Sequence, residues 1–285
     1  MLKVDDELII INDGSYDQSQ QIVEKFSDLD ARVQLINTAG VGLVNALNLG
    51  ISASRSHWIA RFDADDIYAK NRLLEQRKLI SNDVSVIFSD YRFISQRGLP
   101  LGRVPSAIFP NAARLSILSS QRTAHPVALI NRRFLIEAGG YRSEDYPAED
   151  LSLWLRLSSF GKIVSSPKVL LLYRLTSGSV SMQNRKVQKD KTKELVADFE
   201  FWKNCQEDCI INFKNTVSLY RSNSDSSARI FLHIRDILLA QQFTGVRIEF
   251  KELLETLGIL GLSRVIFAGV RLSSWAVFRR IYRTL

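Results

Sequence analysis

The sequence predicts an α/β protein, in which an open sheet of strands joined by helices is followed by a helical extension. In the first half, short β-branched runs alternate with helical patterns, which is typical of strand–helix–strand units. Turns rich in aspartate, asparagine and glycine follow several of these runs. Strand patterns fade at about residue 183. We therefore expect one domain over residues 1–182 and a helical region over 183–285.

The elements can be placed from these patterns. Strands are expected at 7–11, 32–37, 57–62, 84–94, 126–130 and 168–175, and helices ending at 26 and covering about 43–53, 70–80 and 149–160. The segment 98–121 is less regular and is expected to form a flap or an acceptor loop. An open α/β sheet normally has an earlier strand–helix unit before a ligand-binding turn. Because the first strand begins six residues into the chain, the sheet is expected to lack its first strand.

Charge is concentrated at the end of the chain. The net charge is +8, and after Glu255 there are five arginines and no acidic residues. Segment 261–283 combines these arginines with apolar residues at helical spacing, so it is expected to lie on an anionic membrane surface. The alternative is a helix that packs on the first domain. No basic stripe interleaves with aromatic residues in the rest of the chain, so no nucleic-acid partner is expected.

The composition agrees with a protein inside the cell. The only cysteines, Cys205 and Cys209, provide no disulfide framework, and two further soft ligands for a zinc site are not visible nearby. The start has no signal-peptide pattern, and no apolar run is long enough to span a bilayer. We expect a cytoplasmic protein that is peripheral on the inner face of the cell membrane.

An acidic cluster follows the third expected strand. Asp63, Asp65 and Asp66 stand directly after the run that ends at Phe62, where ligands of open α/β sheets bind. Three adjacent carboxylates repel one another unless a cation lies among them, and Mg²⁺ or Mn²⁺ prefers such oxygen ligands. The spacing alone fits equally well with a helix cap.

A second acidic pair, Glu149 and Asp150, begins the expected helix 149–160. A carboxylate there can act as a general base if an acceptor hydroxyl lies beside it. Acidic residues are also favoured in the first turn of a helix because of the helix dipole. Taken alone, this capping interpretation is the stronger one.

Considered together, the motifs indicate a family. The ordered set of NDGS, DADD, GGYR, EDLSLWLRL and YRLTSGSVS, within about residues 5–182, resembles the inverting glycosyltransferases of family 2. Each motif is weak alone, and the order makes the set specific. The resemblance implies a GT-A fold, that of nucleotide-diphospho-sugar transferases, with a Rossmann-like mixed sheet. It also implies transfer of a sugar from a nucleotide-sugar donor to a glycan or lipid-linked acceptor, in surface polysaccharide or lipid-linked glycan assembly.

The resemblance also implies residue roles. Asp150 matches the catalytic base, and Asp63 and Asp65 match the motif that binds a divalent cation, Mg²⁺ or Mn²⁺. In that motif Asp65 matches the usual metal ligand, and Asp63 matches the acid near the ribose of the nucleotide sugar or the metal. Asp13, at the first turn, matches the acid that contacts the nucleotide. The remaining candidates flank these positions: Gly14, Ser15 and Arg72 on the nucleotide-sugar side, and His125 and Glu149 on the acceptor side. His125 fits equally well as a structural histidine.

Two departures from the family pattern leave alternatives open. The family's opening strand has no counterpart, and Thr176 stands where many relatives have a histidine that can reach the metal, so weak metal binding is expected. A non-catalytic paralogue or fragment therefore remains an alternative. A remote one is an NAD-dependent oxidoreductase, because the glycine-rich turn AGVG follows a strand and precedes a helix.

Overall fold

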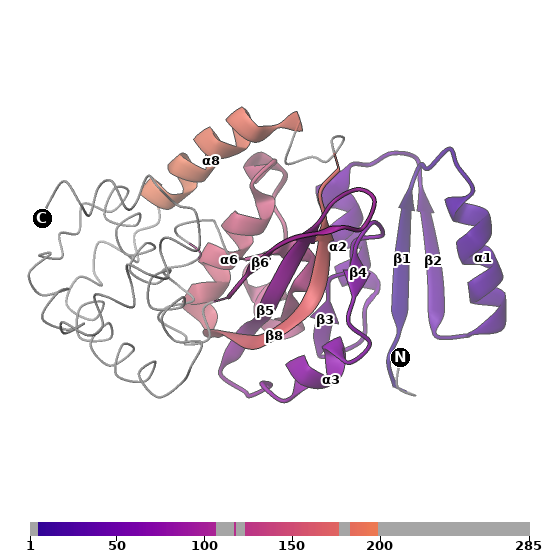
Figure 1. Ribbon diagram of the computed structural model, residues 1–285, viewed down its shortest axis with the longest axis horizontal. Coiled ribbons are helices and arrows are strands. Elements are labelled where there is room, and N and C mark those ends of the chain that lie inside the picture. The colour runs from indigo at the N-terminus through magenta and orange to yellow at the C-terminus, as the bar shows by residue number, and fades with distance from the viewer. Residues whose placement is uncertain (1–4, 107–116, 118–122, 177–182, 199–285) are drawn as a thin grey trace, which may run out of the picture.

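The computed structural model describes residues 5–106, 117, 123–176 and 183–198 (Figure 1). The tail 261–283, both cysteines and most of the expected flap lie outside these residues. The strands of the described part form two separate sheets, with helices around them. No helix within it has the length and apolar character needed to cross a membrane.

The first sheet has two parallel strands, β1 (Leu8–Asp13) and β2 (Val33–Thr38), in register from Leu8 opposite Val33 to Asp13 opposite Thr38. Helix α1 (Ser19–Leu29) connects them. In Figure 1 this unit lies at one end of the described residues. Helix α2 (Leu43–Ala53) follows β2 and packs against β1.

The second sheet has six strands. Its order is β3 (Trp58–Ala60), β7 (Leu129–Asn131), β5 (Val84–Ile94), β8 (Lys162–Arg174) and β4 (Ile67–Tyr68), with β6 (Pro100–Val104) paired to β5. Only β5 and β8 run parallel, and the other pairs are antiparallel. The sheet is therefore mixed.

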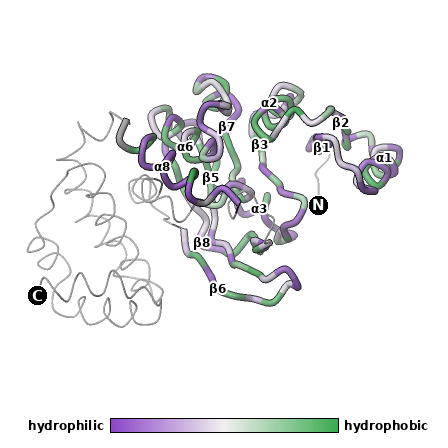
Figure 2. Tube along the Cα trace, turned by 90° about the horizontal axis from the view of Figure 1, so that it is seen from above, coloured by the Kyte–Doolittle hydropathy of each residue, from purple (hydrophilic) through white to green (hydrophobic). Residues whose placement is uncertain are grey.

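Helix α6 (Glu149–Phe160) contacts β5 and contributes four leucines and Trp154 to the buried core. Trp154 is fully buried and meets the Phe88 ring edge-on, with ring centroids 5.1 Å apart. Figure 2 shows apolar residues along β7 and hydrophilic residues along α8 (Arg185–Asp198). The short helices are α3 (Arg72–Arg77), α5 (Arg132–Glu137), η1 (His125–Val127) and η2 (Ser143–Asp145).

Most expected elements are present with shifted ends. The expected helix 43–53, strand 84–94 and helix 149–160 match α2, β5 and α6. The expected strand 126–130 is wrong in its first part, because Pro126 lies in a 3₁₀ turn and pairing starts at Leu129. Segment 98–121 is less irregular than expected, since β6 forms there. The domain boundary at 182 and the missing first strand stay predictions.

Candidate functional site

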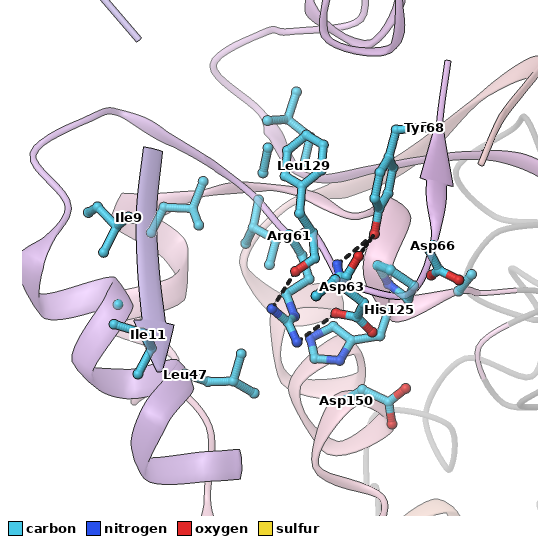
Figure 3. A pocket seen from close by; sticks show the side chains of 18 of the residues that line it. Ile9, Ile11, Leu47, Arg61, Asp63, Asp66, Tyr68, His125, Leu129 and Asp150 are labelled. Atoms are coloured by element: carbon cyan, nitrogen blue, oxygen red, sulfur yellow. Dashed lines mark hydrogen bonds and ion pairs between the residues drawn. The ribbon is translucent and has the colours of Figure 1, made fainter. Parts of the chain in front are cut away.

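A groove of about 2760 Å³ opens between the two sheets and continues to the N-terminus of α6 (Figure 3). Among the described residues, eight buried side-chain N or O atoms have no hydrogen-bond partner, and six belong to residues that line this groove. These six are Arg61 Nε, Asp63 Oδ1, Asp66 Oδ2, Arg72 Nη1, Glu149 Oε2 and Trp154 Nε1. Buried polar groups normally have partners. Their concentration on one groove therefore indicates a site for a polar ligand.

Asp13 lies where β1 ends and anchors the loop before α2. Its Oδ1 accepts hydrogen bonds from Thr38 Oγ1 at 2.5 Å and Val41 N at 2.6 Å, and its Oδ2 accepts one from Gly42 N at 2.9 Å. The hydrogen bond from Thr38 is the largest cause, and together these bonds hold the pKa of Asp13 below its usual value. Asp13 is therefore an anion at neutral pH, and the amides of the glycine-rich turn point at it.

The rest of the NDGS turn follows from Asn12 and Gly14. The Asn12 side chain accepts from Ser15 N at 3.2 Å and donates to Asn37 at 2.8 Å, which ties the turn to the end of β2. Gly14 has φ 76°, and a Cβ there would lie 3.3 Å from Gly40 N. Glycine allows both this backbone conformation and the close approach of the two loops.

Asp63 follows β3 and is held by its neighbours. Its Oδ1 lies 2.6 Å from Arg61 Nη2, an ion pair without hydrogen-bond alignment (Figure 3). Its backbone N–H donates to Tyr68 Oη at 2.6 Å. Burial raises the pKa of Asp63, although the Arg61 charge opposes the shift. The carboxylate thus lies in a partly desolvated position with one cation beside it.

Strand β8 fixes the other two acids of this loop. The Arg174 backbone N–H donates to Asp66 Oδ1 at 2.8 Å, and Arg174 Nε donates to the Asp65 carbonyl at 2.7 Å. Burial raises the pKa of Asp66 to about 6, and Asp65 and Asp63 add to the shift. The Asp65 side chain is exposed.

Arg72 is almost completely buried, with 1% exposure. Its guanidinium lies over the rings of Phe62 at 4.2 Å and Tyr68 at 4.9 Å. Nε donates to Gln76 at 3.0 Å and Nη2 to the Ala128 carbonyl at 3.2 Å, while Nη1 has no partner among the described residues. Arg72 therefore packs against the acidic loop and leaves its Nη1 amino group without a described partner beside the groove.

Glu149 and Asp150 begin α6 beside the same groove. Asp150 Oδ1 accepts the Leu151 N–H at 2.7 Å, so the capping interpretation holds in part. Burial raises the pKa of Asp150, and it raises that of Glu149 to about 7, with the Asp150 charge adding to the latter shift. Glu149 is only 5% exposed. Both carboxyls are therefore stronger proton acceptors than they would be in water.

His125 lines the groove close to Arg61 and Asp63 (Figure 3). Its Nε2 lies 2.7 Å from Tyr141 Oη, and its ring meets Trp154 edge-on. Burial lowers its pKa well below the usual value, with help from the Arg61 charge, so the imidazole is neutral. The hydrogen bond supports the structural interpretation of His125, and the position on the groove is compatible with an acceptor role.

The residues present fit a divalent cation. Burial disfavours the ionised forms of Asp63 and Asp66, and a bound cation would offset that cost. In the described part of the chain, no three His, Cys, Asp or Glu side chains are grouped to hold a metal. Asp63 and Asp65 thus offer part of a coordination shell. This suits Mg²⁺ or Mn²⁺, which also take water and phosphate oxygens as ligands.

Several groove residues were not among the sequence-based candidates. Tyr68, Tyr141 and Arg174 each hold a candidate side chain or its backbone. Arg174 stands inside the YRLTSGSVS motif, which was the available signal. Tyr141 likewise stands inside the GGYR motif. Tyr68 carries no such signal, because its role depends on which strand ends meet.

Residues 2–139 match the family described as Glycosyl transferase family 2. This segment, just under half of the chain, therefore has the sequence pattern of that family. An uncharacterized glycosyltransferase of Haemophilus influenzae is 30% identical over 204 residues, which cover 66% of this chain and 62% of that protein. The O-antigen biosynthesis glycosyltransferase WbnJ of Escherichia coli is 29% identical over 162 residues, covering 54% and 60%. The chain thus spans less than two thirds of either relative.

The family match agrees with the fold. The crystal structure of Staphylococcus aureus TarS, residues 1–349, in complex with UDP-GlcNAc superimposes with a TM-score of 0.54 at 15% identity, covering 92% of this chain and 70% of TarS. The expected GT-A fold is confirmed by this likeness. The oxidoreductase interpretation is set aside, because the glycine-rich turn that prompted it directs its amides to Asp13.

Proposed function

We propose that this family 2 domain transfers a sugar from a nucleotide-diphosphate sugar to an acceptor hydroxyl with inversion of the anomeric centre. The carrying observation is the groove on which Asp13, Asp63, Asp66, Glu149 and Asp150 meet, with polar atoms that lack partners among the described residues. TarS was crystallised with UDP-GlcNAc, which supports a nucleotide sugar as the donor. WbnJ is named for O-antigen biosynthesis, which supports a glycan or lipid-linked acceptor in surface polysaccharide assembly.

The proposed roles follow from position. Asp13 at the end of β1, with Gly14 and Ser15, faces the nucleotide, and Arg72 Nη1 adds a donor from the buried side. His125 and Glu149 lie on the acceptor side. Asp63 and Asp65 would hold Mg²⁺ or Mn²⁺, which supplies positive charge beside the leaving diphosphate.

Asp150 is the proposed base. The acceptor oxygen forms a bond to the anomeric carbon while the bond from that carbon to the diphosphate oxygen breaks. The acceptor proton passes to the Asp150 carboxylate, and the diphosphate keeps the bonding electrons. Burial raises the pKa of Asp150, which makes it a better proton acceptor for this step. Because attack is direct, no covalent sugar–protein intermediate is required.

The test combines transfer with binding. Purified protein is screened against UDP-, GDP- and dTDP-sugars for release of nucleoside diphosphate in the presence of candidate acceptors. Asp150→Asn should lower transfer by roughly 10²–10⁴-fold while donor affinity persists. Asp65→Asn should instead abolish the gain in nucleotide affinity that Mn²⁺ gives over EDTA. Asp28→Asn, on the exposed surface of α1, is the matched control and should change neither quantity.

Three results would contradict the proposal. Transfer by Asp150→Asn at the wild-type level would place the base elsewhere. Equal nucleotide affinity with Mn²⁺ and with EDTA would remove the metal from the site. Donor binding without any transfer would favour the alternative, a non-catalytic paralogue or fragment.

A further inference from the structure

The two sheets face each other across the groove, and each has an edge without a strand partner among the described residues. β1 pairs with β2 alone, and β3 pairs with β7 alone. All residues of β1 and of β3 line the groove. Successive residues of a strand point to opposite faces. A groove lined by every one of them therefore runs along the two strand edges.

The backbone groups that face the groove can be identified. Leu8 N donates to Arg32 O beside β2 at 2.8 Å. Since alternate residues of a strand direct their N–H groups to the same neighbour, the amides of Ile9 and Ile11 face the groove. On β3, Arg61 N donates to Ala128 O at 2.9 Å, so the amide of the preceding residue, Ala60, faces the groove from the other side.

The first four side chains of β1 are apolar on both faces, as in a strand at the centre of a sheet. Its run of one leucine and three isoleucines is typical of a strand buried on both faces. All four residues are nevertheless only partly buried, whereas the first eight residues of β5 are buried. Proline and lysine, which commonly protect strand edges, are absent from β1. The groove walls are also apolar, with Leu47 and Ile51 from α2 and Ile59 from β3.

Ion pairs and hydrogen bonds cross between the sheets at the starts of the two strands. Glu7, directly before β1, accepts hydrogen bonds from Arg55 N at 2.8 Å and Ser56 Oγ at 2.9 Å, just before β3. Asp6 pairs with Arg77 of α3. These links fix one end of the groove. The other end opens at Asp13 and Asp63, so the groove leads directly to the candidate site.

We propose that this groove takes one extended apolar polypeptide strand of about six residues, the length of β1, which pairs with both edges and joins the two sheets. A lipid chain has no acceptors for the amides of Ile9, Ile11 and Ala60. The β1 strand of a second copy is already paired with β2 on one side, so it has only one edge to offer. A separate strand supplies hydrogen-bonding groups on both sides and apolar side chains on both faces.

The test uses the full chain and a synthetic peptide of six alternating valine and isoleucine residues with two lysines at each end. Hydrogen–deuterium exchange at the amides of Ile9, Ile11 and Ala60 should slow together, by about tenfold or more, when the peptide is added. The same peptide N-methylated at all six residues keeps its side chains, but its N-methyl groups project toward the neighbouring strands and block pairing at both edges, so it should give no protection.

A pair of variants on α2 tests the location. Leu47→Arg places a charge on the groove wall and should abolish the protection. Leu49→Arg, on the same helix at a position 40% exposed, should retain it. If Leu47→Arg fails to fold by circular dichroism, the N-methylated peptide still decides the question.

Three outcomes would overturn the inference. Protection at β1 without Ala60 would mean simple addition to one edge. Equal protection by the N-methylated peptide would mean apolar adsorption. Protection that rises with protein concentration in the absence of peptide would mean pairing between two copies. None of these readouts depends on sugar transfer, so a failure of the proposed function would leave this test unaffected.

Discussion

The protonation state that each acidic residue of the site favours depends on its burial and on its hydrogen bonds. Asp13 receives three hydrogen bonds from its own loop and is an anion, whereas Glu149 lies buried beside Asp150 without a partner for Oε2 among the described residues. The sequence shows both only as acidic residues. Burial and hydrogen bonding thus separate a carboxylate that stabilises a turn from one that favours its protonated form.

Glu149 makes stability depend on pH. Burial raises its pKa from 4.5 to about 7, with Asp150 adding to the shift and Arg61 opposing it. The native state therefore binds more protons than the unfolded state in this range, and stability is lost as pH rises from about 4.5 to about 7. Glu149→Gln, which mimics the protonated form, should raise the free energy of unfolding at pH 8 by about 1–3 kcal/mol and change it little at pH 5. Chemical denaturation at both pH values measures this.

The control is Glu137→Gln on α5, where the side chain is 47% exposed. It should show no difference between the two pH values. Destabilisation by Glu149→Gln at pH 8 would mean that the ionised carboxylate makes a stabilising contact.

At the scale of elements, β4, β8 and α3 all contact the acidic loop that follows β3. Tyr68 holds the Asp63 backbone, and Arg174 of β8 holds Asp65 and Asp66. The guanidinium of Arg72, from α3, lies over the rings of Phe62 and Tyr68. The bordering elements β4 and α3 and the distant strand β8 therefore fix the backbone of this loop and the Asp66 carboxylate. Helix α3 is shorter than its sequence pattern predicts, and its first residue contributes the buried guanidinium.

Replacing Arg72 distinguishes support of this loop from contact with the nucleotide. Arg72→Met removes two ring contacts and two hydrogen bonds, so the free energy of unfolding should fall by about 1–3 kcal/mol. Chemical denaturation and UDP titration of the same variant measure both roles. Arg133→Met is the control, because that guanidinium lies over one ring and its side chain is 64% exposed. Unchanged stability with a large loss of UDP affinity would mean that Arg72 acts on the nucleotide alone.

At the scale of the whole molecule, the candidate site joins two sheets. Asp13 comes from the two-stranded sheet, and Asp63 and Asp150 flank the six-stranded one. Their relative position depends in part on the contacts that Glu7 and Asp6 make across the two sheets. The basic segment 261–283 lies outside the described residues, so its membrane role and the peripheral, cytoplasmic location stay predictions.

That membrane prediction can be tested by co-sedimentation. Each of the five arginines after Glu255 should contribute about 1 kcal/mol at an anionic leaflet. The full chain should therefore pellet with anionic liposomes at low salt and much less at high salt, since salt screens these charges. A chain that ends at Leu257 should remain in the supernatant. Aggregation of the shorter chain, with no liposome binding by the full one, would assign the segment to the core instead.

The sequence by itself determined the α/β class, the family and the positions of the acidic motifs. These features depend on local periodicity and on the order of short motifs, which are legible without a structure. The helix at Glu149 and the turn at Asp13 were predictable in this way. Tertiary structure alone decided that the described strands form two separate sheets, that Arg72 is buried with its guanidinium over two rings, and that Tyr68 and Arg174 hold the acidic loop. Such contacts join residues up to 109 positions apart, and strand pairing, which no local pattern encodes, brings them together.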